Sequence, residues 1–251
     1  MQSLCDVAEL QVQDLVLEYQ PIFDLYRLRI ARAEALLRWN HPFLGRLLPA
    51  RFLPSLLRSS DMQGVTRWVF QRAVAQLARW QSNGHRHMRM CVNLGLEELT
   101  DSFPPYALEV LDAHKVSPLD VELELSEQGL LLEEVSAMSV VRRLHASGFR
   151  ISIDDFGAGS ASLRYMLDLP ATTLKFDRFF AAGTPSRRHV AVLEHVSKLA
   201  KELGYHAIVE GIENEEQLQA AISCGAGYAQ GCYLSPPITA ALFETRLREA
   251  P

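Results

Sequence analysis

Two adjacent carboxylates, Asp154 and Asp155, follow a short run of β-forming residues in the stretch 149–160, Phe-Arg-Ile-Ser-Ile-Asp-Asp-Phe-Gly-Ala-Gly-Ser. A strand that ends in two carboxylates and opens into a glycine-containing loop suits the binding of a divalent cation. Asp and Gly are also common in ordinary turns after strands, so this stretch alone fits either interpretation. The choice depends on which other polar residues the fold brings beside the two aspartates.

Polar residues occur at or near the end of almost every strand-like segment: Glu34, Asn93, Glu124, Asp154, Asp155, Lys175, Asp177, Glu210 and Gln230. Because side chains alternate across a strand, Lys175 is expected on the face opposite Leu174 and Phe176. Carboxylates crowded at one place would repel one another unless cations neutralised them. An all-oxygen ligand set indicates Mg²⁺ or Mn²⁺ rather than zinc. Either aspartate could bridge two ions, an arrangement that activates water in phosphodiester hydrolysis.

The elements that must position these residues alternate between strands and helices. The sequence predicts strands at 16–25, 29–39, 88–94, 121–125, the segment beginning at 149, 173–177, 207–210 and 228–234. It predicts helices at 49–81, 106–114, 133–147, 189–203, 215–224 and 240–248. The first two strands are too close for a helical crossover and should be antiparallel. We therefore predict an α/β fold, an irregular (β/α)8 TIM-type barrel with an antiparallel first strand. It should form a single domain over residues 1–251, with a lead-in helix in residues 1–15.

Composition narrows the functional classes. Hydrophobic residues make up 48% and charged residues 22% of the 251-residue chain, which is ordinary for a globular protein. The net charge of −5 gives no broad electrostatic surface for duplex nucleic acid, although a small anionic substrate held by metal ions remains compatible. The sequence shows neither a signal-peptide pattern nor an apolar run long enough for a membrane span, so we expect a soluble, cytoplasmic protein. Four scattered cysteines fit reduced thiols.

The ordered motifs, taken together, resemble the EAL-domain cyclic di-GMP phosphodiesterases of bacteria. These motifs are Glu34-Ala35-Leu36 within Glu-Ala-Leu-Leu-Arg-Trp, Val92-Asn93-Leu94, Glu124-Leu125-Ser126-Glu127, Asp154-Asp155-Phe156-Gly157, Leu174-Lys175-Phe176-Asp177, Glu210-Gly211-Ile212-Glu213 and Gln230-Gly231. The resemblance extends from Tyr19-Gln20-Pro21-Ile22 to about Pro236-Pro237. It implies hydrolysis of cyclic di-GMP to linear pGpG with two Mg²⁺ or Mn²⁺ ions, in a protein that commonly forms homodimers.

The same resemblance implies roles for individual residues. The implied metal ligands are Glu34, Asn93, Glu124, Asp154, Asp155 and Glu210. The implied catalytic set is Lys175, which would hold or activate the attacking water, with Glu34, Asp155 and Glu127, the last of which would fix the loop after Asp155. The implied substrate-binding residues are Gln20, Leu36, Arg38, Asn93, Asp177, Glu213 and Gln230, with Arg38 on a substrate phosphate. A lysine beside two cations should have a depressed pKa, which would allow proton transfer.

The chain departs from the family pattern without losing an implied metal ligand. Ser160 and Ala161 stand where the family has Tyr and Ser, Gly95 stands where Ser is usual, and Cys232 stands where an aromatic is common. The first of these changes lies in the loop that positions Asp155 and contributes to the family's dimer contact. Two alternatives to an active phosphodiesterase stay open: a receptor that binds cyclic di-GMP without cleaving it, and a protein-interaction domain with a vestigial site.

Overall fold

The computed structural model describes residues 12–56, 62–95, 98–126, 135–158, 163–180 and 187–249. Most of the predicted lead-in helix lies outside these ranges; Val12–Asp14 form a 3₁₀ turn (η2), and the first strand begins at Leu15. Glu127, Ser160 and Ala161 also lie outside the described residues. The organisation of residues 1–251 as one domain stays a prediction.

The strands form one mixed sheet that closes on itself. They are β1 (Leu15–Asp24), β2 (Arg29–His41), β3 (Gly45–Leu47), β4 (Arg89–Asn93), β5 (Val121–Ser126), β6 (Arg150–Phe156), β7 (Thr173–Phe176), β8 (His206–Val209) and β9 (Tyr228–Ala229). All except β3 build a barrel in the order β1-β9-β8-β7-β6-β5-β4-β2, closed by the pairing of β1 with β2. β1 is antiparallel to both of its neighbours, and the other barrel pairs are parallel. The predicted irregular barrel with an antiparallel first strand is confirmed.

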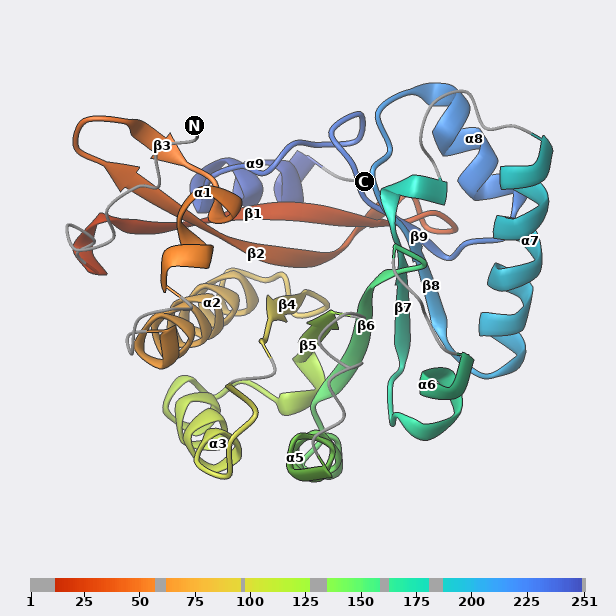
Figure 1. The fold of residues 1–251 in the computed structure, drawn as a ribbon. Helices are drawn as coiled ribbons and strands as arrows, with labels where there is room; N and C mark the ends of the chain where they lie inside the picture. The colour runs from red at the N-terminus through yellow and green to blue at the C-terminus, as the bar shows by residue number, and fades with distance from the viewer. Residues whose placement is uncertain are drawn as a thin grey trace.

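Helices cover the outside of this barrel (Figure 1). They are α1 (Pro49–Leu56), α2 (Met62–Ser82), α3 (Phe103–His114), α5 (Val135–Ala146), α6 (Leu163–Asp168), α7 (Arg187–Glu202), α8 (Glu215–Ser223) and α9 (Ala240–Glu249), with 3₁₀ turns η4 (Pro118–Asp120) and η5 (Arg178–Phe180). Figure 1 shows β1 and β2 continuing beyond the barrel as a long hairpin, with β3 at its far end and α9 beside β1. Among the described helices, none combines the length and apolar character that a membrane crossing requires.

The observed elements differ from the predicted ones in four main respects. The predicted strand 228–234 ends at Ala229, because the backbone N–H groups of Tyr233 and Ser235 bond to Ile212 and Gly231 instead of continuing the sheet. The short strand β3 pairs with the end of β2 and was not predicted. The short helix α6 was also not predicted, and the single helical region expected at 49–81 contains two helices, α1 and α2.

Side chains fill the barrel interior in successive levels. Towards the N-terminal ends of the parallel strands, Arg32 binds Glu122 and Thr173 and lies over the ring of Tyr228. An apolar level follows, in which Ile22, Cys91 and Ile208 form one buried cluster. Above it come Glu34, Glu124, Lys175 and Gln230, at the C-terminal ends of the strands. Such levels of side chains from alternate strands are the normal packing of a TIM barrel, whose active sites lie at the C-terminal end.

Candidate metal and catalytic site

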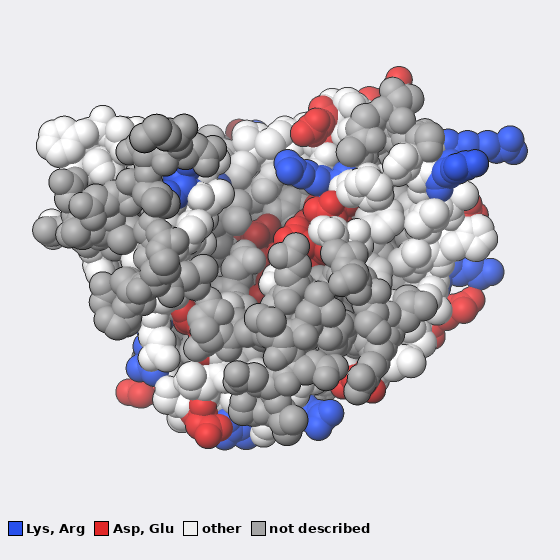
Figure 2. Space-filling view, viewed as in Figure 1, with Lys and Arg blue, Asp and Glu red and all other residues white. Residues whose placement is uncertain are grey.

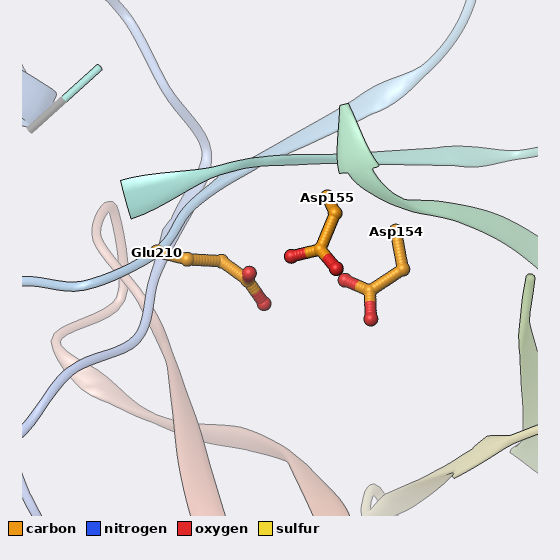
Figure 3. Close-up of side chains that lie close together, drawn as sticks. All are labelled: Asp154, Asp155 and Glu210. Atoms are coloured by element: carbon orange, nitrogen blue, oxygen red, sulfur yellow. The ribbon is translucent and has the colours of Figure 1, made fainter. Parts of the chain in front are cut away.

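Asp154 and Asp155 lie at an irregularity of β6 that brings both carboxylates to the same place. In a regular strand, successive side chains point to opposite faces. Here the register with β7 shifts between Ile153 and Phe156, and Asp155 adopts a left-handed backbone conformation with φ of 54°. Asp tolerates this conformation better than most residues. As a result the two carboxylates lie side by side (Figure 3).

Glu210 completes a group of three carboxylates. It directly follows β8, and its backbone N–H donates to the carbonyl of Phe176 at the end of β7, which fixes it beside the end of that strand. Figure 3 shows its side chain directed towards the two aspartates. One oxygen from each of Asp154, Asp155 and Glu210 lies within 4.8 Å of the others. A divalent cation accepts ligands of this kind at this spacing.

Lys175 lies inside the barrel, as strand alternation predicts, and only 1% of its side chain is exposed. Its ammonium nitrogen is 2.8 Å from Glu210, 3.0 Å from Glu124, 3.0 Å from Asp154 and 3.5 Å from Glu34. Four strands therefore direct carboxylates at one ammonium group. Of the polar residues predicted from the strand ends, those that converge here on Lys175 are Glu34, Glu124, Asp154 and Glu210.

Amide side chains hold Glu34 in place. Gln230 donates from Nε2 to Glu34 Oε2 at 2.6 Å and to Gln20 Oε1 at 3.2 Å. Asn93 donates from Nδ2 to the other oxygen of Glu34 at 2.9 Å. Burial raises the pKa of Glu34, but the Lys175 charge and these amide hydrogen bonds outweigh it and lower the pKa below its usual value. Glu34 is thus held as a carboxylate.

Three acids of the site, Glu124, Asp155 and Glu210, are more easily protonated than usual. Burial raises the pKa of Glu210 to about 8, and Asp154 and Glu34 add to the effect while Lys175 opposes it. Burial also raises the pKa of Glu124 well above its usual value, and that of Asp155 is raised by burial and by Asp154. Burial alone would lower the pKa of Lys175, yet the surrounding carboxylates raise it well above normal. The whole site favours bound positive charge.

Several carboxylate oxygens have capacity for a further cation. Both oxygens of Glu124 and Oδ1 of Asp154 are buried and accept no hydrogen bond in the described structure. Lys175 lies 3.0 Å from one oxygen of each residue, so these contacts are ion pairs without hydrogen-bond geometry. Buried carboxylate oxygens left in this state are costly. Their number and chemistry fit Mg²⁺ or Mn²⁺.

Two cavities open on either side of Leu36. The polar cavity, of about 570 Å³, is lined by Gln20, Glu34, Leu36, Asp154, Asp155, Lys175, Asp177, Arg178, Glu210, Glu213 and Gln230, among others. The apolar cavity, of about 420 Å³, shares Glu34 and Leu36 with it and adds Asn93, Glu124 and side chains of α1 and α2. Figure 2 shows acidic side chains within a hollow near the centre of the viewed face.

Arg38 and Arg178 lie differently with respect to the two cavities. Arg38 donates from Nε to Glu18 at 2.7 Å and from Nη1 to the carbonyl of Leu37, and it is not among the lining residues of either cavity. Arg178, which sequence reasoning passed over, is exposed and lines the polar cavity. Within the described ranges it forms no ion pair. Its position directly after Asp177, at a strand end, was the signal that could have identified it.

A tight packing contact supports the rim of the polar cavity. A Cβ atom at Gly231 would lie 2.2 Å from the carbonyl oxygen of Ile212 and 2.3 Å from its nitrogen. Glycine permits this approach of two backbones. The N–H of Ile212 also donates to the carbonyl of Gln230. Gln230 and Glu213, each next to one of these residues, are positioned by the same contact.

Comparisons with known proteins identify the family of this chain. The EAL domain model matches residues 6–237. A cyclic di-GMP phosphodiesterase of Pseudomonas aeruginosa is 34% identical over 92% of this chain and 40% of its own length. The bifunctional diguanylate cyclase/cyclic di-GMP phosphodiesterase MucR of the same organism is 32% identical over 96% of this chain and 36% of its own length. The chain thus spans less than half the length of these curated relatives.

Solved structures show the same fold. The MucR phosphodiesterase in complex with c-di-GMP aligns with a TM-score of 0.86 and 30% identity, covering 92% of this chain and 94% of that one. The EAL domain of Mycobacterium smegmatis DcpA aligns with a TM-score of 0.80 and 28% identity, covering 94% and 98%. The family model covers most of the sequence, and the site residues lie at the ends of the barrel strands. The chain belongs to the EAL domain family.

Proposed function

We propose that this chain is a metal-dependent phosphodiesterase that hydrolyses cyclic di-GMP to linear pGpG. The observation that carries the proposal is the convergence of Glu34, Glu124, Asp154 and Glu210 on Lys175 at the C-terminal end of the barrel. Membership of the EAL family, and relatives whose names specify this activity, support the choice of substrate.

The residues that would hold two Mg²⁺ or Mn²⁺ ions are Glu34, Asn93, Glu124, Asp154, Asp155 and Glu210. When bound, such cations lower the pKa of a coordinated water and stabilise negative charge on phosphoryl oxygens. The chain's own contribution is to orient these ligands. Gln230 and Asn93 orient Glu34 and help to keep it deprotonated, and the bulge in β6 orients Asp155.

We propose that Lys175 holds the attacking water and stabilises negative charge. Its ammonium group lies among the acidic ligands, and its three N–H donors allow it to bind a water oxygen as well as carboxylates. In the overall reaction, the water oxygen bonds to phosphorus and the bond from phosphorus to the 3′ oxygen breaks. One water proton ends on that 3′ oxygen, and the other is released from the new terminal phosphate.

The two cavities suit a substrate with two nucleoside halves. Leu36 and Glu34 separate a polar cavity from an apolar one, so a dinucleotide could lie across them. Arg178 is placed to bind a substrate phosphate or guanine at the polar end, because its guanidinium is free of carboxylate partners among the described residues. Arg38 could contact a phosphate only if its pair with Glu18 opened. Asp177 and Glu213 line the same polar cavity.

Assembly and location are extensions of this proposal. We propose a homodimer, as the family resemblance suggests, and action in the cytoplasm, where a cyclic dinucleotide signal is made and degraded. Analytical ultracentrifugation of the purified chain tests the first: sedimentation as a monomer at micromolar concentration would contradict it.

The activity is tested by incubating purified protein with cyclic di-GMP and Mg²⁺ or Mn²⁺ and separating the nucleotides by chromatography. We expect pGpG, no product in EDTA, and no product from Glu34→Ala. Glu249→Ala, near the end of α9, provides a matched control that should retain activity. Binding of cyclic di-GMP without product would favour the receptor alternative, and absence of binding would favour an interaction domain. Full activity of Glu34→Ala would refute the metal assignment.

A further inference from the structure

Basic side chains gather at the end of the barrel opposite Lys175. Arg89 begins β4, Arg150 begins β6 and His206 begins β8. Each is two residues before an interior position of its strand, namely Cys91, Ser152 and Ile208, all of which are completely buried. Because side chains alternate, these three residues form the lowest level at the N-terminal end of the barrel, where Arg89 and Arg150 are partly buried and His206 is exposed.

Arg32 forms the level directly above. Its side chain is 1% exposed, and Nη1 donates to Glu122 at 2.6 Å and to Thr173 at 3.2 Å. Its Cζ atom lies 4.4 Å from the centre of the Tyr228 ring, and the centre of the His206 ring lies 5.7 Å from that of Tyr228. Tyr228 thus links Arg32 to the lowest level. Nε and Nη2 of Arg32 are buried without a hydrogen-bond partner in the described structure.

The positive charge at this end is not balanced. Glu122 neutralises Arg32, and Asp24 at the same end of β1 is bonded to Arg27. Asp120 accepts a hydrogen bond from Gln81 rather than from an arginine.

Neither Arg89 nor Arg150 has a carboxylate at ion-pair distance among the described residues. Arg150 donates a hydrogen bond from Nε to the carbonyl of Leu119. Both are partly buried, so water screens their repulsion less than at an open surface.

The pKa values of Arg89 and His206 are lowered in part by the same positive charges. Burial lowers the pKa of Arg89, and the charges of Arg150 and Arg32 lower it further. Burial also lowers the pKa of His206, followed in effect by the charge of Arg32. An anion at this position would relieve the repulsion among the three guanidinium groups. Guanidinium groups bind the oxygens of phosphate in a bidentate manner, which favours an oxoanion over chloride.

We propose that the N-terminal end of the barrel, formed by Arg89, Arg150 and His206 beneath Arg32, is a binding site for a phosphate group. It is separated from the acidic site by the apolar level of Ile22, Cys91 and Ile208. The phosphate group is either that of inorganic phosphate or that of a nucleoside monophosphate. The proposal is independent of the phosphodiesterase activity, because none of its residues lines the polar cavity.

Thermal unfolding tests this site on the whole chain in EDTA, with inorganic phosphate or GMP compared with chloride at equal ionic strength. At about ten times the dissociation constant, a single site should raise Tm by about 3–5 °C. The double variant Arg89→Gln/Arg150→Gln should lose this shift. Arg142→Gln on the exposed side of α5 is the matched control and should retain it. A larger shift with GMP than with inorganic phosphate identifies a nucleotide as the source, and equal shifts identify the free anion.

Further measurements distinguish the loss of phosphate binding from a loss of folding in the variants. Because Arg89 repels its neighbours, Arg89→Gln alone should have an unchanged or higher Tm in chloride. Broadening of the phosphate ³¹P resonance should occur with wild type and be absent with the double variant. An unchanged phosphate shift in the double variant, or no effect of either phosphate compound on wild type, would overturn the proposal.

Discussion

Replacing Lys175 with Met removes the ammonium group that four carboxylates share while keeping a side chain of similar length. Because Lys175 is 1% exposed and lies within 3.5 Å of all four acids, its loss leaves buried negative charge without its partner. Removal of one member of a buried ion pair typically costs about 3–5 kcal/mol. For a chain of this size, that corresponds to a decrease in Tm of roughly 6–20 °C in EDTA.

Divalent cation should reverse this loss. Lys175 competes with bound cations for the same carboxylates, since a unit charge about 4 Å away contributes roughly 4 kcal/mol at the effective dielectric of a protein. Even a third of that energy is about a tenfold change in affinity. We therefore expect Lys175→Met to bind Mg²⁺ at least about tenfold more tightly than wild type at pH 8, while its rate of cyclic di-GMP hydrolysis falls.

Thermal unfolding followed by circular dichroism, in EDTA and across a Mg²⁺ titration, measures both effects. Lys198→Met on the exposed surface of α7 is the matched control and should change neither Tm nor Mg²⁺ affinity. If Lys175→Met were as stable as wild type in EDTA and bound Mg²⁺ no more tightly, Lys175 would not be the counter-ion of the acidic site, and the reasoning would fail.

Three further predictions follow from the site. Because burial raises the pKa of Glu210 from 4.5 to about 8, the folded metal-free protein retains a proton that the unfolded chain releases. This contribution to stability is complete below pH 4.5 and is lost as the pH rises through about 8. Glu210→Gln should therefore flatten the dependence of Tm on pH. An unchanged slope would contradict the pKa assigned to Glu210. Gly231→Ala should lower the free energy of unfolding by about 1–3 kcal/mol in urea denaturation because its Cβ would overlap Ile212, whereas Gly64→Ala, with open space around it, should not destabilise. Arg178→Gln should raise KM for cyclic di-GMP by about tenfold or more, with a smaller change in kcat; an unchanged KM would exclude a role in substrate binding.

Much of the fold and site could be predicted from the sequence because both depend on the alternation of side chains between the two faces of a strand. Leu174 and Phe176 pack outward, which places Lys175 inside, and parallel strands bring their polar ends to one end of the barrel. The short connection after Asp24 fixed the antiparallel start. These features follow from local sequence and the general geometry of barrels.

Features that depend on long-range contacts could not be predicted in this way. The bulge that brings Asp155 beside Asp154 arises from the register between β6 and β7. The early end of β9 depends on the approach of Gly231 to Ile212, and the pairing of Arg38 with Glu18 depends on the register of β1 and β2. Each of these features depends on which distant residues are neighbours in the folded chain. A single sequence does not state these pairings explicitly.

The buried ion pair between Arg32 and Glu122, beneath the acidic site, could not be predicted for the same reason. Strand alternation puts Glu122 and Glu124 on the same face of β5, yet it gives no partner for Glu122. The partner is Arg32, which is 90 residues away in the sequence. A charged pair of this kind is recognised only when the barrel has closed.

The most direct test of the central claim is a single titration in which cation binding and product formation are measured on the same wild-type sample. Isothermal calorimetry gives the occupancy of the acidic site by Mn²⁺, and chromatography of matched aliquots with cyclic di-GMP gives the rate of pGpG formation. We expect pGpG to form only as the site fills, and we expect both signals to disappear in Glu34→Ala. Full cation occupancy with bound cyclic di-GMP and no pGpG would contradict the claim.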